Sequence, residues 1–447
     1  MKTPLEIGPS ISRRNFVLSA AALPLASSLL ASHESRAARL DDSTRNLRIG
    51  LIGCGGRGTG AAVQALRADP NTTLVAMGDV FADRLQTSLT GINEEMAEEA
   101  AKRVQVPTEK QFVGFDSYQK VIDSDVDVVL ITGYPAFRPV QLAAAIAAGK
   151  HVFAEKPLAV DAAGIRSCLE SARVAKEKNL ALMVGFCWRH NPGMKAAFEK
   201  VASGGIGDLV SVHTTYHTST LTKRPRKPEW TEMEFQLRNW WHFAWISGDH
   251  IVEQAIHSID RMAWAMGDRL PARVNCLGGR AARTGEESGD VFDHFAAIYE
   301  YDDGTRAFHT TRQIDSCPSD NTDYVYGTKG RCTINGWAPI YEIRNRKNEV
   351  EWKGNGTPEE ASQMYQFEHN ELFKSIRAGK PINDGERSAN SCMMAIMARM
   401  AAYTGQTVTW DQALNAEDKL VPDNLAFGNA PPVNIPVPGK TKIAFGK

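Results

Sequence analysis

The sequence predicts a two-domain protein in which a doubly wound parallel α/β sheet precedes an α+β domain built on a large, mostly antiparallel β-sheet. Three observations support this prediction. Apolar runs alternate with helical patterns between residues 47 and 186, as in parallel β-α-β units. A glycine-rich turn follows the first of these runs. Beyond residue 208, several β-type runs follow one another with few helical patterns between them.

The first strand and its turn lie in Leu47–Gly58. Gly53, Gly55 and Gly58 form G-x-G-x-x-G between an apolar run and a helical pattern over 59–67. The first glycine permits the tight turn, the second lets the backbone approach a pyrophosphate, and the third lets the helix pack on the strand. The free N–H groups of the helix N-terminus suit phosphates. We therefore predict a Rossmann dinucleotide-binding domain; the alternative is a glycine-rich turn in another kind of α/β protein.

The second β-type run, residues 73–80, indicates which dinucleotide is bound. It contains Asp79, about twenty residues beyond the last glycine. A carboxylate at this position accepts hydrogen bonds from the ribose hydroxyls of NAD and repels the 2′-phosphate of NADP. The predicted cofactor is therefore NAD, with NADP disfavoured.

The remaining elements of the first domain are strands near 127–132, 151–154 and 181–186, separated by helices over 140–148 and 162–178. Ligands of such sheets bind beyond the carboxyl ends of the strands. We therefore take residues at these ends as candidate cofactor contacts: Gly53, Gly55, Gly56, Arg57, Gly58, Asp79, Thr132, Tyr134, Pro135, Glu155, Lys156 and Trp188. This gives a Rossmann domain over 38–190.

The second domain is predicted over 191–419 and ends in an irregular arm, 420–447. Its β-type runs suggest one large sheet, and helices near 359–378 and 387–404 are expected to cover or close it. Residues 218–247 are rich in Lys, Arg, Pro and Trp and lack a clear period. Because long loops in compact domains are usually functional, this segment is predicted to form a substrate-binding wall, with a subunit interface as the alternative.

A second group of polar residues falls on a predicted helix, Asp249–Met266. At about 100° per residue, His250, Glu253, His257 and Asp260 share one face. A histidine can take a hydroxyl proton near neutral pH, and a carboxylate one turn away can orient it. A solvated polar stripe fits the same periodicity, and His250, Glu253 and His257 could also bind a metal.

The run Ala-Gly-Lys-His-Val-Phe-Ala-Glu-Lys-Pro-Leu, with Glu155-Lys156-Pro157 at its end and the glycine turn upstream, resembles the Gfo/Idh/MocA oxidoreductases. That family includes glucose–fructose oxidoreductase and inositol dehydrogenases. The resemblance covers nearly the whole chain after residue 37, and Asn239-Trp240-Trp241 with the proline-rich tail is similar to a secreted branch. It implies that Lys156 binds the reacting hydroxyl. Glu253 and His257 stand where the family has D-x-x-x-H, with Glu in place of Asp. It also implies that nicotinamide and substrate occupy this space, which disfavours a metal.

The sequence thus predicts an NAD-dependent oxidoreductase acting on a sugar or cyclitol hydroxyl. In this interpretation His257 takes the proton, Lys156 holds the oxygen and Glu253 positions His257. Further substrate contacts are predicted at Arg189, His190, Tyr216 and Trp240. One alternative is an NAD-dependent glycosidase that oxidises C3 transiently, and another is a non-catalytic cofactor-binding sensor or scaffold.

Composition and the N-terminus indicate where the protein acts. The 51 Lys and Arg balance 52 Asp and Glu, which does not favour nucleic acid or an anionic membrane as a partner. The seven cysteines have no zinc-type spacing. Ser12-Arg13-Arg14 before a short apolar stretch predicts a twin-arginine signal over 1–37 and export to the periplasm. A homo-oligomer, dimer or tetramer, is expected because an open sheet needs its outer face covered.

Overall fold

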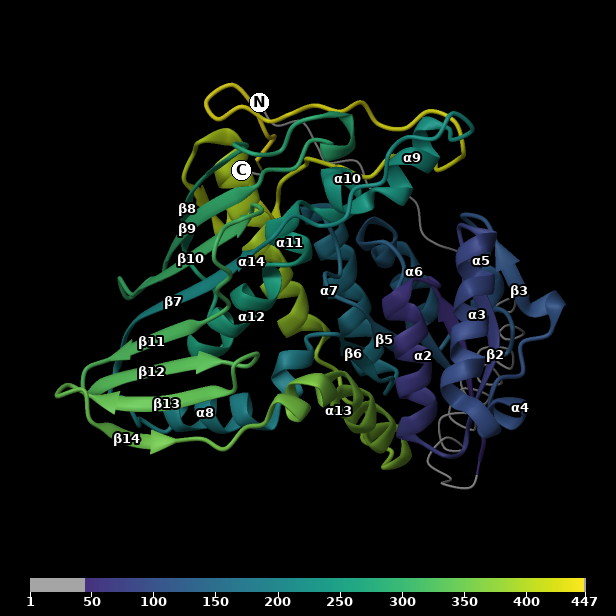
Figure 1. The fold of residues 1–447 in the computed structure, drawn as a ribbon, viewed down its shortest axis with the longest axis horizontal. Helices are drawn as coiled ribbons and strands as arrows, with labels where there is room; N and C mark the ends of the chain where they lie inside the picture. Colours follow the sequence, from purple (N-terminus) through teal and green to yellow (C-terminus); the bar gives the residue numbers. More distant parts are fainter. Residues whose placement is uncertain (1–44, 446–447) are drawn as a thin grey trace, which may run out of the picture.

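The computed structural model describes residues 45–445, and the predicted signal segment, 1–37, lies outside them. The described chain forms two halves, each built around its own sheet (Figure 1). The parallel sheet and its helices lie on one side, and the larger sheet lies on the other. This arrangement confirms the fold class predicted from the sequence.

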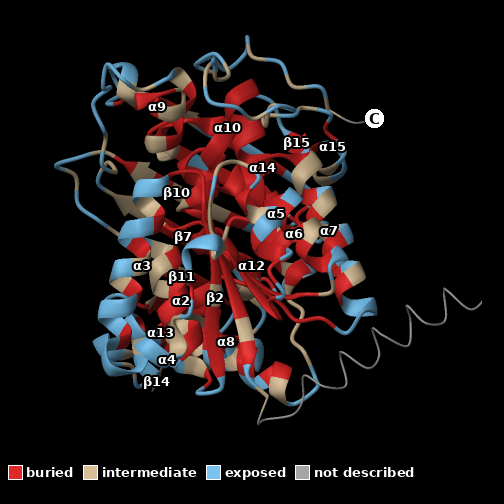
Figure 2. Ribbon diagram, turned by 90° about the vertical axis from the view of Figure 1, so that its right-hand side faces the viewer, coloured by how far each residue is buried: buried red, intermediate tan, exposed pale blue. Residues whose placement is uncertain are grey.

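The first sheet has six parallel strands in the order β3-β2-β1-β4-β5-β6. The strands are β1 Leu47–Ile52, β2 Thr72–Asp79, β3 Gln111–Val113, β4 Val128–Ile131, β5 His151–Ala154 and β6 Leu182–Val184. Most of their side chains are buried, as the red central strands in Figure 2 show, which explains their continuous apolar runs. The strand order reverses between β1 and β4, so a ligand crevice opens beyond the carboxyl ends of these two strands.

Helices connect these strands and cover the sheet. They are α2 Gly56–Ala68, α3 Ala82–Met96, α4 Ala100–Arg103, α5 Ser117–Ile122, α6 Arg138–Ala147 and α7 Ala162–Glu177. The glycine turn leads directly into α2, as the sequence predicted. Gly149 follows α6 with a positive φ of 71°, the left-handed geometry expected after a helix C-terminus.

The second sheet has nine strands in the order β14-β13-β12-β11-β7-β10-β9-β8-β15. Only β7 and β10 pair in parallel; the other neighbours are antiparallel. The strands are β7 Leu209–Thr218, β8 Arg273–Gly279, β9 His294–Glu300, β10 Arg306–Gln313, β11 Asp323–Gly327, β12 Gly330–Asn335, β13 Ile340–Asn345, β14 Val350–Lys353 and β15 Val408–Thr409. The last three were not predicted, because β13 and β14 carry many charged residues and β15 has only two residues.

The C-terminal helices join the two halves. The predicted helix near 359–378 is α13, Pro358–Arg377, and the one near 387–404 is α14, Gly385–Thr404. The expectation that both cover the large sheet is wrong for α13, which packs against α2 of the first half. There Arg377 forms an ion pair with Asp69 at 2.6 Å. Helix α14 lies between α7 and β8 and therefore contacts both halves.

The predicted single helix over 249–266 is two helices, α11 His250–Glu253 and α12 Ile256–Ala265. Ala255 N–H donates to the carbonyl of His250, five residues earlier, and this one wide turn interrupts the regular ladder. The wide turn rotates the second segment relative to the first, so the predicted polar stripe does not stay on one face.

Above the crevice lie two segments from the second half of the chain. Residues 219–247 contain α9 Glu232–Arg238 and α10 Ala244–Ser247, where the sequence suggested an irregular loop. Residues 415–445 contain no helix or strand and run across the top of the molecule to α9 (Figure 1). Gly428 accepts a backbone hydrogen bond from Met233 of α9 at 3.0 Å. The remaining helices are α8 Pro192–Ala202 and α15 Trp410–Leu414.

Candidate active site

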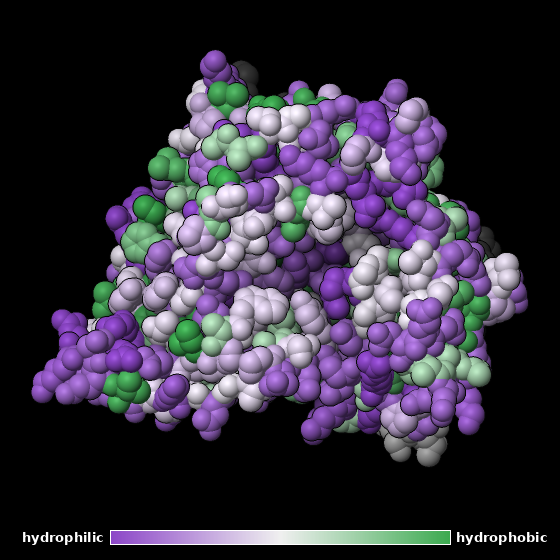
Figure 3. All heavy atoms as spheres, viewed as in Figure 1, coloured by the Kyte–Doolittle hydropathy of each residue, from purple (hydrophilic) through white to green (hydrophobic). Residues whose placement is uncertain are grey.

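A cleft of about 720 Å³ opens between the two halves, at the carboxyl ends of β1, β2, β4 and β5. Figure 3 shows it as a hollow in the middle of one face, surrounded mainly by hydrophilic residues. The first half contributes the glycine turn and the strand ends. The second half contributes residues of β7, of the 219–247 segment and of the α11–α12 turn. The cleft therefore lies where the reversed strand order predicts a ligand.

The glycine turn has the backbone geometry that a dinucleotide needs. Gly53 has a φ of +92°, and a Cβ there would lie 2.2 Å from the backbone N of Gly133. A Cβ at Gly58 would lie 1.9 Å from the carbonyl oxygen of Gly53, so α2 packs tightly against the turn. Cβ atoms at Gly55 and Gly56 would meet no atom within 4 Å. The turn is thus closely packed at Gly53 and Gly58. It is unobstructed at Gly55 and Gly56, where a pyrophosphate can approach the helix N-terminus.

Asp79, the last residue of β2, hydrogen-bonds to the same turn. Its carboxylate accepts hydrogen bonds from the backbone N–H groups of Cys54 at 2.6 Å and Phe81 at 2.8 Å. Burial raises the pKa of Asp79, while these two backbone hydrogen bonds oppose that change. The carboxylate lines the cleft and keeps lone pairs for ribose hydroxyls, since each oxygen can accept two hydrogen bonds.

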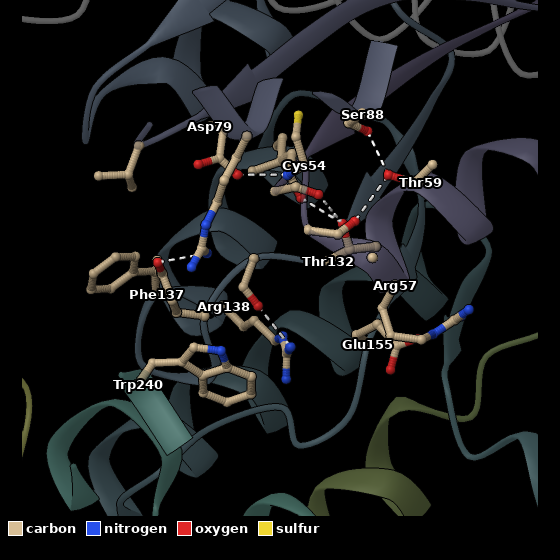
Figure 4. A pocket seen from close by; sticks show the side chains of 18 of the residues that line it. Cys54, Arg57, Thr59, Asp79, Ser88, Thr132, Phe137, Arg138, Glu155 and Trp240 are labelled. Atoms are coloured by element: carbon tan, nitrogen blue, oxygen red, sulfur yellow. Dashed lines mark hydrogen bonds and ion pairs between the residues drawn. The ribbon is translucent and has the colours of Figure 1, made fainter. Parts of the chain in front are cut away.

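Polar side chains tie the neighbouring strand ends together (Figure 4). Thr132, after β4, lies with its hydroxyl 2.6 Å from the carbonyl oxygen of Gly53. Arg138 donates to the carbonyl oxygens of Gly133 at 2.7 Å and Pro157 at 2.6 Å. These contacts connect the glycine turn to the segment that follows β5, which carries Lys156.

Arg57 and Glu155 form the floor of the cleft. The guanidinium of Arg57 is 2.7 Å from the carboxylate of Glu155 and lies 4.3 Å over the ring of Tyr365. Glu368, fully buried beside them, has a strongly raised pKa because of burial and the charge of Glu155. The side chains of Arg57 and Glu155 thus hold one another while they line the cleft.

Lys156, Glu253 and His257 meet in the cleft from both halves of the chain. The Lys156 ammonium donates to the carbonyl oxygen of Glu253 at 2.6 Å and lies 3.6 Å from its carboxylate. The Lys156–Pro157 peptide bond is cis. His257 is buried, and its Nδ1 has no hydrogen-bond partner among residues 45–445. Burial, and then the charges of Lys156, Arg261 and Arg57, lower the pKa of His257 well below its usual value. The imidazole is therefore neutral near pH 7 and can accept a proton.

Two domain profiles of one family match this chain. Residues 47–186 match the profile described as "Oxidoreductase family, NAD-binding Rossmann fold", and residues 194–333 match the GFO/IDH/MocA C-terminal domain. The chain belongs to the Gfo/Idh/MocA family. The glycine turn, Asp79 and the Glu155-Lys156-Pro157 segment all lie in the first matched region, while Glu253 and His257 lie in the second.

Curated relatives of this Gfo/Idh/MocA protein include mouse trans-1,2-dihydrobenzene-1,2-diol dehydrogenase, 29% identical over 252 residues. Another is inositol 2-dehydrogenase 3 of Saccharopolyspora erythraea, 28% identical over 262 residues. The matches cover 56% and 58% of this chain, and 66% and 64% of those relatives. The chain thus spans somewhat under two thirds of the length of these relatives.

Solved structures share the fold. A levoglucosan dehydrogenase in complex with NADH and levoglucosan superposes with a TM-score of 0.64 at 18% identity, over 82% of this chain and 100% of that one. An apo scyllo-inositol dehydrogenase from Lactobacillus casei gives a TM-score of 0.61 at 20% identity, over 82% and 99% of the two chains. The two-sheet architecture of the Gfo/Idh/MocA member described here is therefore that of known dehydrogenase structures.

Most of the residues predicted from the sequence line the cleft of this family member. They are Gly53, Gly55, Gly56, Arg57, Asp79, Thr132, Tyr134, Glu155, Lys156, Tyr216, Trp240, Glu253 and His257. Gly58 lies beneath the cleft and acts through helix packing. Pro135 starts the short helical turn Pro135–Phe137 but is not among the lining residues.

Three predicted contacts lie outside the cleft. Trp188 is buried against Trp337, with ring centroids 5.0 Å apart. Arg189 pairs with Asp260 at 2.9 Å and with Asp268 at 2.6 Å. His190 lies 3.0 Å from the carboxylate of Glu371. The short helical turn after β6 directs these side chains into packing, so the structure does not bring these predicted cofactor and substrate contacts to the cleft.

Only part of the polar stripe predicted on helix 249–266 lines the cleft. His250 is within hydrogen-bonding distance of the Phe292 carbonyl oxygen, at 3.0 Å, and Asp260 pairs with Arg189; neither lines the cleft. Glu253 contacts Lys156 and makes no hydrogen bond to His257 among the described contacts, so the predicted orienting bond is absent. Over residues 45–445 no group of three His, Cys, Asp or Glu side chains could hold a metal ion.

Sequence analysis predicted the 218–247 segment as a wall of the site but did not single out every residue that the second half contributes. Arg224, Arg238, Trp241 and Gln254 line the cleft but were not named individually; the first three lie in the segment predicted as a wall. Helix α13 also contributes Tyr365, about 300 residues away from the glycine turn in sequence. Gln254 stood beside the predicted Glu253, and this adjacency was the only signal for it in the sequence. Along the described chain, no helix has both the length and the apolarity required to cross a bilayer.

Proposed function

We propose that this protein is an NAD-dependent oxidoreductase that acts on a hydroxyl group of a sugar, sugar derivative or cyclitol. The observation that carries the proposal is that Lys156 and neutral His257 line the same cleft as the glycine turn and Asp79. The relatives named as dihydrodiol and inositol dehydrogenases support the class of substrate. A bound nicotinamide would supply the hydride acceptor for the carbon that is oxidised.

The chain's own residues would perform the proton chemistry. His257 takes the proton of the reacting hydroxyl, since the imidazole is neutral before the reaction and therefore has a nitrogen lone pair to accept it. Lys156 donates a hydrogen bond to the same oxygen and stabilises the negative charge that develops there. Since Glu253 contacts Lys156, we assign it the positioning of Lys156 and not of His257.

We further propose that the cofactor is held tightly and recycled in the cleft: oxidation of one substrate would reduce it, and reduction of a second substrate, or of the same intermediate, would reoxidise it. Arg238 of α9 forms an ion pair with Asp83 of α3 at 3.0 Å and lies 4.1 Å over Phe81. Phe427 of the C-terminal segment packs on Phe81 and Phe115, with ring centroids 5.8 and 5.1 Å apart. These contacts bridge the mouth of the cofactor crevice and support slow release. Such retention also suits the second candidate, an NAD-dependent glycosidase that oxidises and re-reduces one substrate.

The proposal extends to the location and assembly of the protein. The twin-arginine pattern supports export to the periplasm, where free NAD is scarce and a retained cofactor is useful. The outer face of the large sheet exposes Leu277 and Ile298, whose exposed fractions are 72% and 38%, and this supports a homo-oligomer. Light scattering of the purified protein would measure the oligomeric state, and fractionation of expressing cells would locate it.

One preparation tests the activity. The protein is purified without added nucleotide, denatured, and analysed for NAD and NADP; near-stoichiometric NAD is expected. The native protein is then incubated with a panel of sugars, cyclitols and glycosides. A ketone product identifies the oxidoreductase, and a new reducing sugar without net NADH change identifies the glycosidase. Absence of turnover on every compound would leave only the non-catalytic cofactor-binding alternative and would refute the proposal.

A further inference from the structure

We propose that Gln254 determines substrate specificity by presenting its amide N–H₂ group, and not its carbonyl oxygen, to the substrate. This inference rests on the proposed function and assigns one residue of the same cleft. Gln254 lies at the wide turn between α11 and α12, one residue beyond Glu253 and three before His257. It lines the cleft and is half-buried. Its side chain therefore reaches the space that Lys156 and His257 share.

The orientation of the Gln254 amide is fixed by a buried arginine. Arg283 donates to the Oε1 of Gln313, and a guanidinium has no acceptor with which to reverse this bond. The amide of Gln313 must then direct its Nε2 away, and this Nε2 donates to the Oε1 of Gln254. The carbonyl oxygen of Gln254 is thus engaged. Its Nε2 makes no hydrogen bond to any of residues 45–445 and remains available to a ligand.

The series of hydrogen bonds from Arg283 through Gln313 to Gln254, called the relay below, is equally constrained at its other end. Arg283 also donates to the Nδ1 of His242 at 2.7 Å, and the Nε2 of His242 is 3.3 Å from the carbonyl oxygen of Thr222. Because Nδ1 accepts, the imidazole must be neutral with its proton on Nε2, which donates to Thr222. Burial and the charge of Arg283 lower the pKa of His242 to about 4, which agrees with this tautomer.

The backbone holds the arginine in place. Asp293 accepts hydrogen bonds from three successive N–H groups, those of Ala281, Ala282 and Arg283, at 2.7, 2.7 and 3.0 Å. The side chains of the relay are almost fully buried: His242, Gln313 and Arg283 have exposed fractions of 0%, 1% and 4%. Rotation of any amide in the relay would place two donors or two acceptors against each other away from water, which is costly.

Because the Gln254 amide cannot rotate, its N–H₂ group determines which kind of substrate group can bind opposite it. The cleft side of Gln254 favours an oxygen that accepts a hydrogen bond: a hydroxyl, a carbonyl or a ring oxygen of a cyclic polyol, near the carbon on which Lys156 and His257 act. It disfavours a substrate that offers only a donor or an apolar group at that position. Sites built to hydrogen-bond a substrate discriminate strongly against analogues that lack the partner, since the buried polar group is then unpaired.

Replacement of Gln313 reverses the polarity of the relay without touching the cleft. In Gln313→Glu the carboxylate keeps Arg283 paired but cannot donate, so the amide of Gln254 turns and directs its own N–H₂ group inwards. Gln313→Leu cuts the relay. Gln366→Glu on α13 is the matched control, because Gln366 donates to the carbonyl oxygen of Gln64 and does not line the cleft.

The first measurement needs no substrate. In the ¹⁵N-glutamine-labelled holoprotein, the side-chain amide signal of Gln254 is assigned by its loss in Gln254→Glu. We expect fast exchange of these protons with water in the parent protein, and at least tenfold slower exchange in Gln313→Glu, with no change in Gln366→Glu. Slow exchange in the parent, or equal rates in the parent and Gln313→Glu when both are folded, would overturn the assigned orientation.

The second measurement tests what the donor recognises. Dissociation constants and kcat and KM are determined for a monodeoxy and a monodeoxyfluoro series of the best substrate. The parent should prefer the fluoro over the deoxy analogue at one position, because fluorine still accepts a hydrogen bond. This preference should vanish or invert in Gln313→Glu, a shift of at least fivefold in KM. An unchanged preference would overturn the specificity role, whereas failure of the parent to bind any sugar would refute only the proposed function.

Discussion

The two walls of the cleft are built by different means. The glycine-turn wall is made of backbone: its shape depends on Gly53 and Gly58, where a Cβ would meet backbone or side-chain atoms at 1.9–2.7 Å. The α11–α12 wall depends on side-chain contacts, such as that of Gln254 with Gln313 and that of Glu253 with Lys156 from the first half. The first wall tolerates no added atom at Gly53 or Gly58, and the other wall depends on charge and hydrogen-bond direction.

This difference separates binding from chemistry. The backbone wall offers N–H groups and a helix N-terminus to any dinucleotide phosphate, so it defines a cofactor class. The side-chain wall provides the proton acceptor, His257, and holds the ammonium of Lys156, which comes from the first half. Substitutions on the first wall should therefore change cofactor content, and substitutions on the second wall should change turnover while the cofactor stays bound.

The largest expected effect is on the side-chain wall. His257→Ala and Lys156→Ala should each lower kcat by about 10²–10⁴-fold, the usual range for a lost acid–base group. Steady-state kinetics on the best substrate, with NAD content measured after denaturation, tests both parts of the prediction. Near-full activity of His257→Ala would show that the imidazole is structural, and loss of NAD in either variant would erase the distinction between the walls.

The backbone wall is tested by two alanines three residues apart. Gly55→Ala adds a methyl group in open space above the turn, so the protein should fold but bind NAD about 10–100-fold more weakly, from about 1–3 kcal/mol of overpacking against the ligand. Gly58→Ala would instead clash with the Gly53 carbonyl and should lower the thermal stability itself. If Gly55→Ala keeps its NAD with unchanged affinity, no phosphate group lies over this glycine.

Low pH should reduce the folding stability of both halves because each contains a buried, neutral histidine. Burial lowers the pKa of His151, at the start of β5 in the first sheet, to about 4, and that of His309, in β10 of the second sheet, to about 3. The unfolded chain, with pKa values near 6.5, binds more protons than the folded one between these limits. Stability should therefore fall as pH drops from about 6.5 towards 4, by on the order of 2 kcal/mol per histidine.

Thermal unfolding midpoints between pH 7 and 4.5 measure this loss. His151→Gln and His309→Gln should each flatten the pH dependence, while replacement of His294, whose side chain is 45% exposed, should not. A midpoint that stays constant from pH 7 to 4.5 would contradict the burial of neutral imidazoles in both halves.

The smallest expected effect concerns the choice of cofactor. Asp79 should favour NAD over NADP by at least about tenfold, or about 1.4 kcal/mol, through contact with the ribose and repulsion of a 2′-phosphate. Competition between the two cofactors during reconstitution measures the ratio, and Asp79→Ala should reduce it. Equal binding by the parent protein would mean that the carboxylate, held by Cys54 and Phe81, does not face the ribose.

The sequence alone determined the features that arise within short stretches of chain. The turn at Gly53–Gly58, Asp79 at the end of β2 and Lys156 beyond β5 were predictable, because strand ends of a parallel sheet converge at one edge. The alternation of strands and helices gave the fold class for the same reason. The roles of Lys156, Glu253 and His257 required the family resemblance, since a lone lysine at a strand end has no distinctive pattern.

Only the tertiary structure decided which side chains face each other. Trp188, Arg189 and His190 follow a strand as the cofactor contacts do, yet they pack into the interior because partners such as Asp260 and Glu371 approach from distant elements. The wide turn at Ala255 divided a stripe that ideal helical periodicity had joined. Arg283, Gln313 and Gln254 lie up to 59 residues apart, and hydrogen bonds across such separations leave no periodic trace in the sequence. Their physical effect depends on burial and bond direction, which exist only once the chain has folded.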